Sequence, residues 1–459
     1  MVSMPRRRPS RIDLAGFTLA AAIVLTTAIL VAHAALLPEG HWQADDFICA
    51  AFARDFGLRY LWRARIDGWS PRPFSELPLY VFSRLAAARR EPFTVPFLGL
   101  LWLTLLASTL VTSRRRPAMA LRILIGLATA CMFLLGHPVA EMFFWPAGAV
   151  AYLTTLAASS LALFLLVDGR AASRSGAVAL SASLTICAAS SEAGALAAVP
   201  LTFAVAASLS HRHRALLLPP LVMAGFVCWT LAHNRLAPAG AAAQPAPLHH
   251  VVQSLRGVPG TLLDDMRPLW PSRLLFALGL RWCWTRAARG ARPPAVLVRF
   301  AAALVVAASA TIAASYFQTG TLCCERHDTL RQDWLILALA GLAIWSTRWP
   351  PGQGIARLGP AALLVACLLG VAPRLPAIIG DFRLMHTIVA VDRGNWRAGR
   401  DASTPAMVFQ LPPPAAIAGA VLIPPGRYAE PTTAWFAHGI MDFFGKRSIT
   451  IRPPAASPS

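Results

Sequence analysis

The sequence predicts an all-α polytopic membrane protein with about eleven transmembrane helices, a long helical first periplasmic loop and a small C-terminal extramembrane segment. Three observations lead to this fold class. Hydrophobic residues make up 56% of the 459 residues, the mean hydropathy is +0.55, and charged residues make up only 14%. Apolar runs long enough to cross a bilayer recur from residue 14 to about residue 379. The charged residues stand in short islands between these runs, which marks the islands as loops.

The chain begins with a basic stretch that is followed by a long apolar run. Arg6, Arg7, Arg8 and Arg11 precede the apolar segment 14–37. A helix of this length spans about 30 Å of hydrocarbon, and it is longer than the apolar part of a cleavable secretory signal. We therefore interpret the segment as a retained signal anchor with its N-terminus in the cytoplasm.

Further apolar runs give the remaining candidate spans. The run 177–209 is too long for one span and is interrupted at Ser190, Ser191, Glu192 and Gly194, which favours two short helices that meet at a polar turn. Dividing this run brings the total to about eleven spans. The runs lie at 14–37, 95–112, 118–137, 147–167, 177–209, 215–234, 268–284, 296–316, 333–347 and 358–379.

The arginine clusters between these spans predict the orientation of the chain. Cytoplasmic loops carry an excess of basic residues, so loops that hold the clusters should all lie in the cytoplasm. The clusters do fall on alternate loops, and an odd number of spans then puts the C-terminal segment on the outer side. We expect a multi-pass protein of the bacterial inner membrane, with this segment in the periplasm. They are Arg6 to Arg11, Arg114 to Arg116, Arg170 with Arg174, Arg212 with Arg214, Arg281 to Arg299, and Arg348 with Arg357.

Two domains follow from this topology. Residues 1–379 form a multispanning membrane domain, whose first outer loop, about 38–94, is rich in acids and aromatic residues. Residues 380–459 form a C-terminal periplasmic segment with prolines between short β-favouring runs such as Ala420–Ile423 and Ser448–Ile451. We expect its last residues, 453–459, to be disordered.

The net charge of +21, from 42 basic and 21 acidic residues, would suggest nucleic acid as a partner in a soluble protein. Here the basic residues stand at the ends of apolar segments, where they orient helices and contact anionic lipid headgroups. The sequence therefore predicts a lipid bilayer as a partner and no nucleic acid.

The eight cysteines show no metal-binding spacing. Most of them lie inside apolar segments, where a cysteine packs as a small hydrophobic residue. Cys323 and Cys324 are adjacent in a loop that we place outside. We predict no metal ligands, and the sequence leaves open whether a divalent metal is required as a cofactor.

Two adjacent carboxylates follow the first span. Asp45 and Asp46 stand in the run HWQADDF at 41–47. A carboxylate at the membrane surface among aromatic residues can accept a proton from an acceptor hydroxyl, so both are candidate catalytic residues. The alternative is structural, because Asp45 also suits a helix N-cap followed by a first-turn acid.

Trp69 and Arg72 belong to the run WSPRPFSE at 69–76 in the same loop. The two prolines fix the backbone around Arg72, whose guanidinium can face a phosphate. Trp69 is a candidate for the wall of a substrate cavity. The alternative is an arginine that extends toward lipid headgroups without a specific ligand.

A third run, HPVAEMFFWPAG at 137–148, is followed by Tyr152. Glu141 is a candidate second catalytic carboxylate, and Trp145 and Tyr152 are candidates for the substrate cavity. Aromatic residues at a membrane interface are common, and a solvated loop acid is an equally good interpretation of Glu141.

Charged residues close to the membrane complete the candidate set. Glu192 lies between two half-spans, where an acid is costly and is either paired with an arginine or functional. Arg326 and Arg331, before the tenth span, offer such partners and a second phosphate clamp, with His327 beside them in the cavity. If the site exists, Asp45, Asp46, Glu141 and Arg72 should converge on one outward-facing cavity.

Three of these features together resemble bacterial members of the GT-C glycosyltransferase superfamily. They are the Asp-Asp pair that opens the first outer loop, the segment Trp-Ser-Pro-Arg at 69–72, and the segment Phe-Trp-Pro-Ala-Gly-x-x-x-Tyr at 144–152. The resemblance implies a multispanning enzyme that transfers a sugar, hexosyl or pentosyl, from a polyprenyl-phosphate donor to a glycan or lipid acceptor in the cell envelope.

By position, the resemblance implies that Asp45 or Asp46 is the general base or orients the acceptor, and that Glu141 is a second acidic position. It implies a phosphate-binding role for Arg72, although Pro71 stands where glycine is more familiar. A transporter or flippase and a non-catalytic membrane protein are the alternatives. No internal repeat is present and the acids concentrate in an outer loop, which both count against transport.

Overall fold

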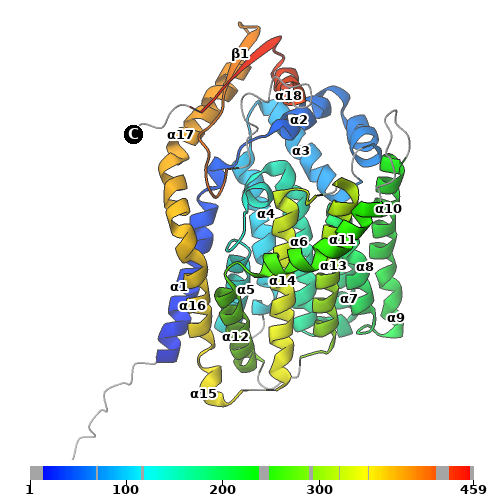
Figure 1. Cartoon of the computed structure of the whole chain (residues 1–459), viewed down its shortest axis with the longest axis vertical. Helices are drawn as coiled ribbons and strands as arrows, with labels where there is room; N and C mark the ends of the chain where they lie inside the picture. Colours follow the sequence, from blue (N-terminus) through cyan, green and yellow to red (C-terminus); the bar gives the residue numbers. More distant parts are fainter. Residues whose placement is uncertain are drawn as a thin grey trace, which may run out of the picture.

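The computed structural model describes residues 14–68, 71–114, 118–236, 248–288, 293–319, 321–349, 351–419 and 434–454, and its main body is a bundle of helices (Figure 1). Most bundle helices run through apolar parts of the sequence, whereas the helix at 248–266 is amphipathic, contains Arg256, Asp264 and Asp265, and coincides with no predicted span. The bundle helices are α1 (Leu14–Ala34), α4 (Thr94–Thr109), α5 (Met119–Met132), α6 (Pro146–Val167), α7 (Arg174–Ser190), α8 (Glu192–Ala206), α10 (Leu218–Leu236), α11 (Leu248–Met266), α12 (Trp270–Ala287), α13 (Val296–Thr319), α14 (Glu325–Trp345) and α16 (Gly359–Val371).

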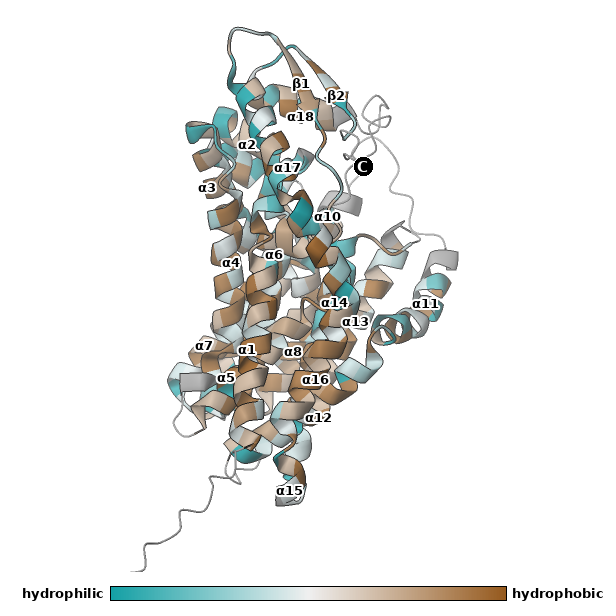
Figure 2. Cartoon of the chain, turned by 90° about the vertical axis from the view of Figure 1, so that its left-hand side faces the viewer, coloured by the Kyte–Doolittle hydropathy of each residue, from teal (hydrophilic) through white to brown (hydrophobic). Residues whose placement is uncertain are grey.

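The bundle has a buried centre and an apolar exterior. Helix α6 is rich in Ala, Ser and Leu and is buried on nearly all sides, because small residues let neighbouring helices approach closely. Helices α1 and α10 instead expose large apolar side chains such as Val24 and Trp229. Figure 2 shows hydrophobic residues along the whole length of the bundle. An apolar exterior of this kind fits a lipid bilayer and would be costly in water.

Among the described residues, five helical segments are long and apolar enough to cross a membrane. Three shorter helices, α4, α5 and α8, are also apolar. The chain is therefore helical and a multi-pass membrane protein, as the sequence predicts. The five segments are Leu14–Glu39, Pro146–Val167, His211–His233, Val296–Phe317 and Gly359–Arg400.

The long apolar run 177–209 forms two helices, as predicted. Helix α7 ends at Ser190, and α8 begins at Glu192 after one extended residue, Ser191, whose side chain accepts a hydrogen bond from the backbone N–H of Gly194. A Cβ atom on Gly194 would lie 2.0 Å from the carbonyl oxygen of Cys187. Only glycine allows α7 and α8 to meet so closely at this turn.

Segments from both ends of the chain form a cap at one end of the bundle (Figure 1). Strands β1 and β2 pair in parallel, with Ala406 opposite Ser448, and α18 packs on α2. The cap has its own apolar core, in which the rings of Trp42 and Trp396 lie 5.1 Å apart. Its elements are α2 (Ala44–Phe56), the π-helical turn η2 (Tyr60–Asp67), α3 (Pro73–Arg89), β1 (Ala406–Gln410), α18 (Ala434–Phe444) and β2 (Ser448–Arg452).

Helix α17 (Leu375–Arg400) joins the bundle to the cap without interruption. The predicted boundary between residues 379 and 380 falls inside this helix, and the C-terminal segment packs on the first loop. Strand β2 coincides with the predicted β-favouring run at 448–451, whereas the run 420–423 lies outside the described residues. Disorder is predicted for residues 453–459. The structure describes residues 453 and 454, and residues 455–459 lie outside the described residues.

The opposite end of the bundle carries short basic elements. Helix α9 (His211–Arg214) consists entirely of basic residues, and α15 (Gln353–Ala356) is followed by Arg357. Both helices lie at the far end of the molecule from the cap (Figure 1). The two ends of the bundle therefore differ, with a folded aromatic cap at one and short basic elements at the other.

Candidate functional site

The first turn of α2 fixes Asp46 as a structural group. The backbone N–H of Gln43 donates to Asp46 Oδ2 at 2.8 Å, and Trp145 Nε1 donates to the same oxygen at 2.7 Å. The first bond belongs to a capping box at the helix N-terminus, and the second joins α2 to the start of α6. Burial raises the pKa of Asp46 to about 7, although both hydrogen bonds oppose the shift.

Asp45, one residue earlier, has a different environment. Its side chain is partly exposed and interacts electrostatically with the guanidinium groups of Arg65, Arg326 and Arg72. Burial raises the pKa of the Asp45 carboxyl, and these three positive charges oppose the rise. In the part of the chain that the structure describes, this carboxylate forms no hydrogen bond. Asp45 is thus the acid of the pair without a hydrogen bond, whereas Asp46 accepts two bonds at Oδ2 and none at its buried Oδ1 among the described residues.

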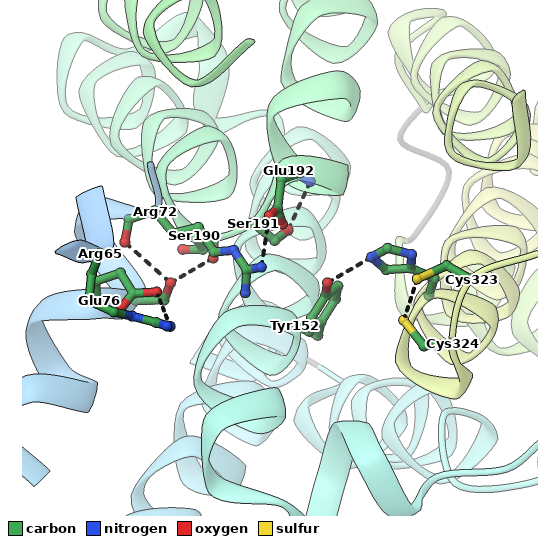
Figure 3. A network of polar contacts seen from close by, with 12 residues as sticks. Arg65, Arg72, Glu76, Tyr152, Ser190, Ser191, Glu192, Cys323 and Cys324 are labelled. Carbon is green, nitrogen blue, oxygen red and sulfur yellow. Dashed lines mark hydrogen bonds and ion pairs between the residues drawn. The ribbon is translucent and has the colours of Figure 1, made fainter. Parts of the chain in front are cut away.

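Arg72 lies at the N-cap position of α3 and is held by Glu192. Its Nη2 donates to Glu192 Oε1 at 2.7 Å, and both side chains are mostly buried. Ser75 Oγ donates to the carbonyl oxygen of Ser190 at 2.7 Å (Figure 3). The start of α3 is therefore attached at two points to the turn between α7 and α8.

A second arginine of the first loop is held in the same way. Arg65 Nε and Nη2 donate to the two carboxylate oxygens of Glu76, each at 2.8 Å. The glutamate side chain is only 3% exposed, so this two-point pair connects η2 rigidly to the first turn of α3. Figure 3 shows the pair beside the contact of Arg72 with Glu192.

Arg326 is positioned by the π-helical turn η4 (Ala140–Phe144) and by the start of α6. Its Nη1 donates to Glu141 Oε2 at 3.1 Å, and its guanidinium carbon lies 5.0 Å from the centre of the Trp145 ring. Gly148 lets η4 lie directly against α6, because a Cβ atom there would be 2.2 Å from the carbonyl oxygen of Glu141. The close approach places Glu141 and Trp145 on the two sides of Arg326.

Tyr152 connects the two halves of the site. Its ring centre lies 6.0 Å from the guanidinium carbon of Arg72 and 5.8 Å from that of Arg326. Its hydroxyl is hydrogen-bonded to His327 Nε2 at 2.7 Å. We call the connected group the cap-end network; its members are Asp45, Arg65, Arg72, Glu76, Glu141, Trp145, Tyr152, Glu192, Arg326 and His327.

The structure brings most of the predicted site residues into this network. Asp46 borders it through Trp145, so the four residues expected to converge do lie together, whereas a cavity between them stays a prediction. Trp69 lies outside the described residues. Arg65 and Glu76 are members that sequence reasoning missed, because their pairing depends on how η2 turns back onto α3 and leaves no local pattern.

Arg331 belongs to a different group of residues. Its Nε and Nη2 donate to the Asp265 carboxylate at 3.0 and 3.3 Å, and its side chain is 1% exposed. Nearby, His137 Nε2 lies 3.0 Å from Asp333 Oδ1. Arg273 Nη2 donates to the side-chain oxygen of Gln332 at 3.0 Å. These six residues form the helix-buried network, in which Arg331 is paired with Asp265. Arg331 Nη1 also lies 2.7 Å from Asp328 Oδ1, and the phosphate-binding role of Arg331 stays a prediction.

The cap-end network combines charged side chains with buried aromatic rings. Three guanidiniums can donate hydrogen bonds to a phosphate and Asp45 can accept a proton, whereas the rings of Trp145 and Tyr152 are buried, at 6% and 1% exposure. Searches with this chain found no matching protein family, curated protein or solved structure. The function must therefore be argued from the contacts of the network themselves.

Proposed function

We propose that the chain is a glycosyltransferase that moves a sugar from a polyprenyl-phosphate donor to a cell-envelope acceptor at the outer face of the bacterial inner membrane. The observation that carries the proposal is the position of Asp45. It is a carboxylate without a hydrogen-bond donor in the described parts of the chain, and it faces three arginines at the cap end of an apolar bundle. A base and a phosphate-binding group are the two requirements of this reaction.

In the proposed reaction, Asp45 accepts the proton of the acceptor hydroxyl as its oxygen attacks the anomeric carbon of the sugar. The bond from that carbon to the phosphate oxygen breaks, and the polyprenyl phosphate leaves with the electron pair. A single displacement of this kind inverts the anomeric centre and needs one base. Arginine side chains stabilise the charge that develops on the leaving phosphate.

The exposure of the three arginine–glutamate pairs suggests which guanidinium turns toward the phosphate. Glu76 is 3% exposed in its pair with Arg65, whereas Glu141 and Glu192 are 15% and 20% exposed in theirs. The longest of the pairs, at 3.1 Å, joins Arg326 to Glu141. Arg326 and Arg72 are therefore the arginines that can exchange a glutamate for a phosphate, and Arg65 holds the loop in place.

The proposed topology has eleven spans, a cytoplasmic N-terminus and a periplasmic C-terminus. Its support is the difference between the two ends of the bundle, since the short basic elements lie at the end opposite the cap. Arginine-rich turns are retained in the cytoplasm. The cap and its network would then face the periplasm, where polyprenyl-linked sugars are presented to envelope acceptors.

The test is transfer of a radiolabelled sugar from polyprenyl-phosphate donors in membranes with matched amounts of wild type, Asp45→Asn and Asp46→Asn. We expect Asp45→Asn to lower transfer about 100-fold or more, because the base is lost. Asp46→Asn is the matched control, since an amide oxygen can still accept from Gln43 and Trp145. Equal loss in both variants would contradict the role of Asp45. No transfer by wild type from any donor would contradict the enzyme class.

The break between α7 and α8 supports transport as a second candidate, because interrupted helices with an acid at the break are common in transporters. Glu192 is that acid here, and it is paired with Arg72. Under this alternative, Glu192→Gln abolishes uptake or flipping of a labelled lipid-linked sugar in proteoliposomes, and Asp45→Asn leaves it intact. The reverse order of effects would support the transferase.

A further inference from the structure

Two thiols and an imidazole lie together at the start of α14, beside the cap-end network. Cys324 is the N-cap residue of this helix, Cys323 precedes it, and His327 is in the first turn. The two Sγ atoms are 2.9 Å apart and neither cysteine forms a disulfide. One ligand atom from each of the three side chains lies within 4.8 Å of the other two. Figure 3 shows the two cysteines facing the side of the network that contains Tyr152.

The imidazole of His327 is already oriented for a ligand. Its Nε2 is hydrogen-bonded to the hydroxyl of Tyr152 at 2.7 Å, which leaves Nδ1 as the free ring nitrogen. Nδ1 is buried, and it has no hydrogen-bond partner among the described residues. A buried ring nitrogen normally has a partner, and a metal-bound histidine usually has its second nitrogen fixed by a hydrogen bond of this kind.

We propose that Cys323, Cys324 and His327 bind a thiophilic divalent metal ion of the zinc class. Two thiolates and one neutral imidazole nitrogen form a three-ligand set that zinc uses when a fourth position is kept open. Tetrahedral binding requires the two sulfurs to separate from 2.9 Å to about 3.8 Å. Cys323 is exposed, so its side chain can rotate by this amount without disturbing the bundle.

The charges around the three ligands are compatible with a metal. Two thiolates neutralise a divalent ion, so the nearby guanidinium of Arg326 faces no added net charge. Sequence reasoning missed the site because adjacent cysteines lack the spacing of known zinc motifs. The extended backbone at Cys324 and the helical turn after it bring both sulfurs to the histidine.

The metal would also affect the cap-end network through Tyr152. This side chain lies between Arg72 and Arg326 and holds the imidazole from the side opposite the thiols. A bound ion would fix the histidine and, through it, the position of the tyrosine hydroxyl. The metal proposal stands on this donor set alone and is independent of the reaction proposed above.

The test uses the full chain in detergent, reduced with a non-chelating phosphine, loaded with Zn²⁺ and desalted, with the metal-to-protein ratio measured by mass spectrometry. We expect one zinc ion per chain in wild type and at least a tenfold lower affinity in Cys323→Ser, Cys324→Ser and His327→Gln. Cys228→Ser is the matched control, because Cys228 is an exposed thiol on α10. Loading with Co²⁺ should give sulfur-to-cobalt charge-transfer absorption in wild type and in the control only.

Several results would overturn the proposal. One is reduced wild type that holds no zinc, and another is Cys323→Ser that binds it as tightly as wild type. A disulfide between Cys323 and Cys324 in freshly isolated membranes, detected by differential alkylation, would also overturn it, since oxidised sulfurs are not thiolate ligands. Because Cys323 is exposed, its serine variant keeps the test valid if His327→Gln fails to fold.

Discussion

The cap-end network and the helix-buried network are built from the same residue types but differ in what is left without a partner. In the helix-buried network Arg331 is paired with both Asp265 and Asp328, and Asp333 is paired with His137. In the cap-end network three arginines are each paired with a glutamate, and Asp45 remains as an additional carboxylate. The comparison teaches that a carboxylate without an ion-pair partner, and not the number of charges, distinguishes a candidate site from a structural network.

The largest expected effect comes from breaking the helix-buried network. Arg331→Met should lower the free energy of unfolding by about 3–5 kcal/mol, because it leaves the buried Asp265 without its partner. Thermal unfolding of the detergent-solubilised protein, followed by size-exclusion chromatography, measures this. Arg212→Met on the exposed helix α9 is the control.

The double variant Arg331→Met with Asp265→Leu should recover most of that loss, because both buried charges are then removed. If the single variant were as stable as wild type, Arg331 would not be a structural residue. Such a result would favour the predicted phosphate-binding role of Arg331.

The second effect separates charge pairing from ligand binding in the cap-end network. Exchanging the two partners, Arg72→Glu with Glu192→Arg, keeps the ion pair but moves the positive charge from α3 to α8. We expect thermal stability close to wild type and sugar transfer about 100-fold lower, as for loss of one positioned donor. Parallel measurements of unfolding temperature and of radiolabelled transfer are needed. Sugar transfer at the wild-type rate in this double variant would show that the ion pair is only structural.

A third effect follows from the raised pKa of Asp46. This pKa is about 7 in the folded chain, whereas an unfolded chain has the ordinary value of 3.8, so the folded state binds more protons between these values. Stability should therefore fall by about 2 kcal/mol from about pH 5.5 to 7. Asp46→Asn, which cannot titrate, should show a smaller fall. Unfolding temperatures of both proteins across this range test the prediction, and identical slopes would contradict it.

The smallest effect concerns the attachment of α3 to the turn between α7 and α8. Ser75→Ala removes the hydrogen bond to the carbonyl oxygen of Ser190 and should cost about 1 kcal/mol. Ser83→Ala in the same helix is a matched control. Its hydroxyl is equally buried and has no partner among the described residues, so its removal should cost nothing. Equal unfolding temperatures for the two variants would show that the hydrogen bond of Ser75 does not contribute to stability.

The bundle was largely predictable because apolar length and polar interruptions are local properties of the sequence. The break at Ser191 between α7 and α8 is an example. The end of α17 was not predictable from hydropathy, because its hydrogen-bonded backbone continues past residue 379 into a polar stretch. Strand β1 was missed because its partner, β2, lies about 40 residues further along the chain.

For the candidate site, proximity in sequence was a poor guide. Arg326 and Arg331 are five residues apart on α14, which places their side chains about 140° apart around the helix. One therefore faces Glu141 and the other faces Asp265. Glu141 and Arg72 were predicted individually, but their arginine and glutamate partners depend on the packing of distant helices. The catalytic roles themselves stay predictions.

The aromatic core of the cap sets an order of events for biosynthesis. The rings of Phe47 and Phe443 lie 5.6 Å apart, and Arg54 donates a hydrogen bond to the carbonyl oxygen of Phe443. Almost the whole chain separates these contacts, so the core around α2 is complete only after α18 has been synthesised. A chain that ends before α18 would keep the packing of α2 on α3 and the hydrogen bond from Trp145 to Asp46, but would lack the aromatic contacts of α18. Helix α18 thus completes the apolar core against which α2 packs.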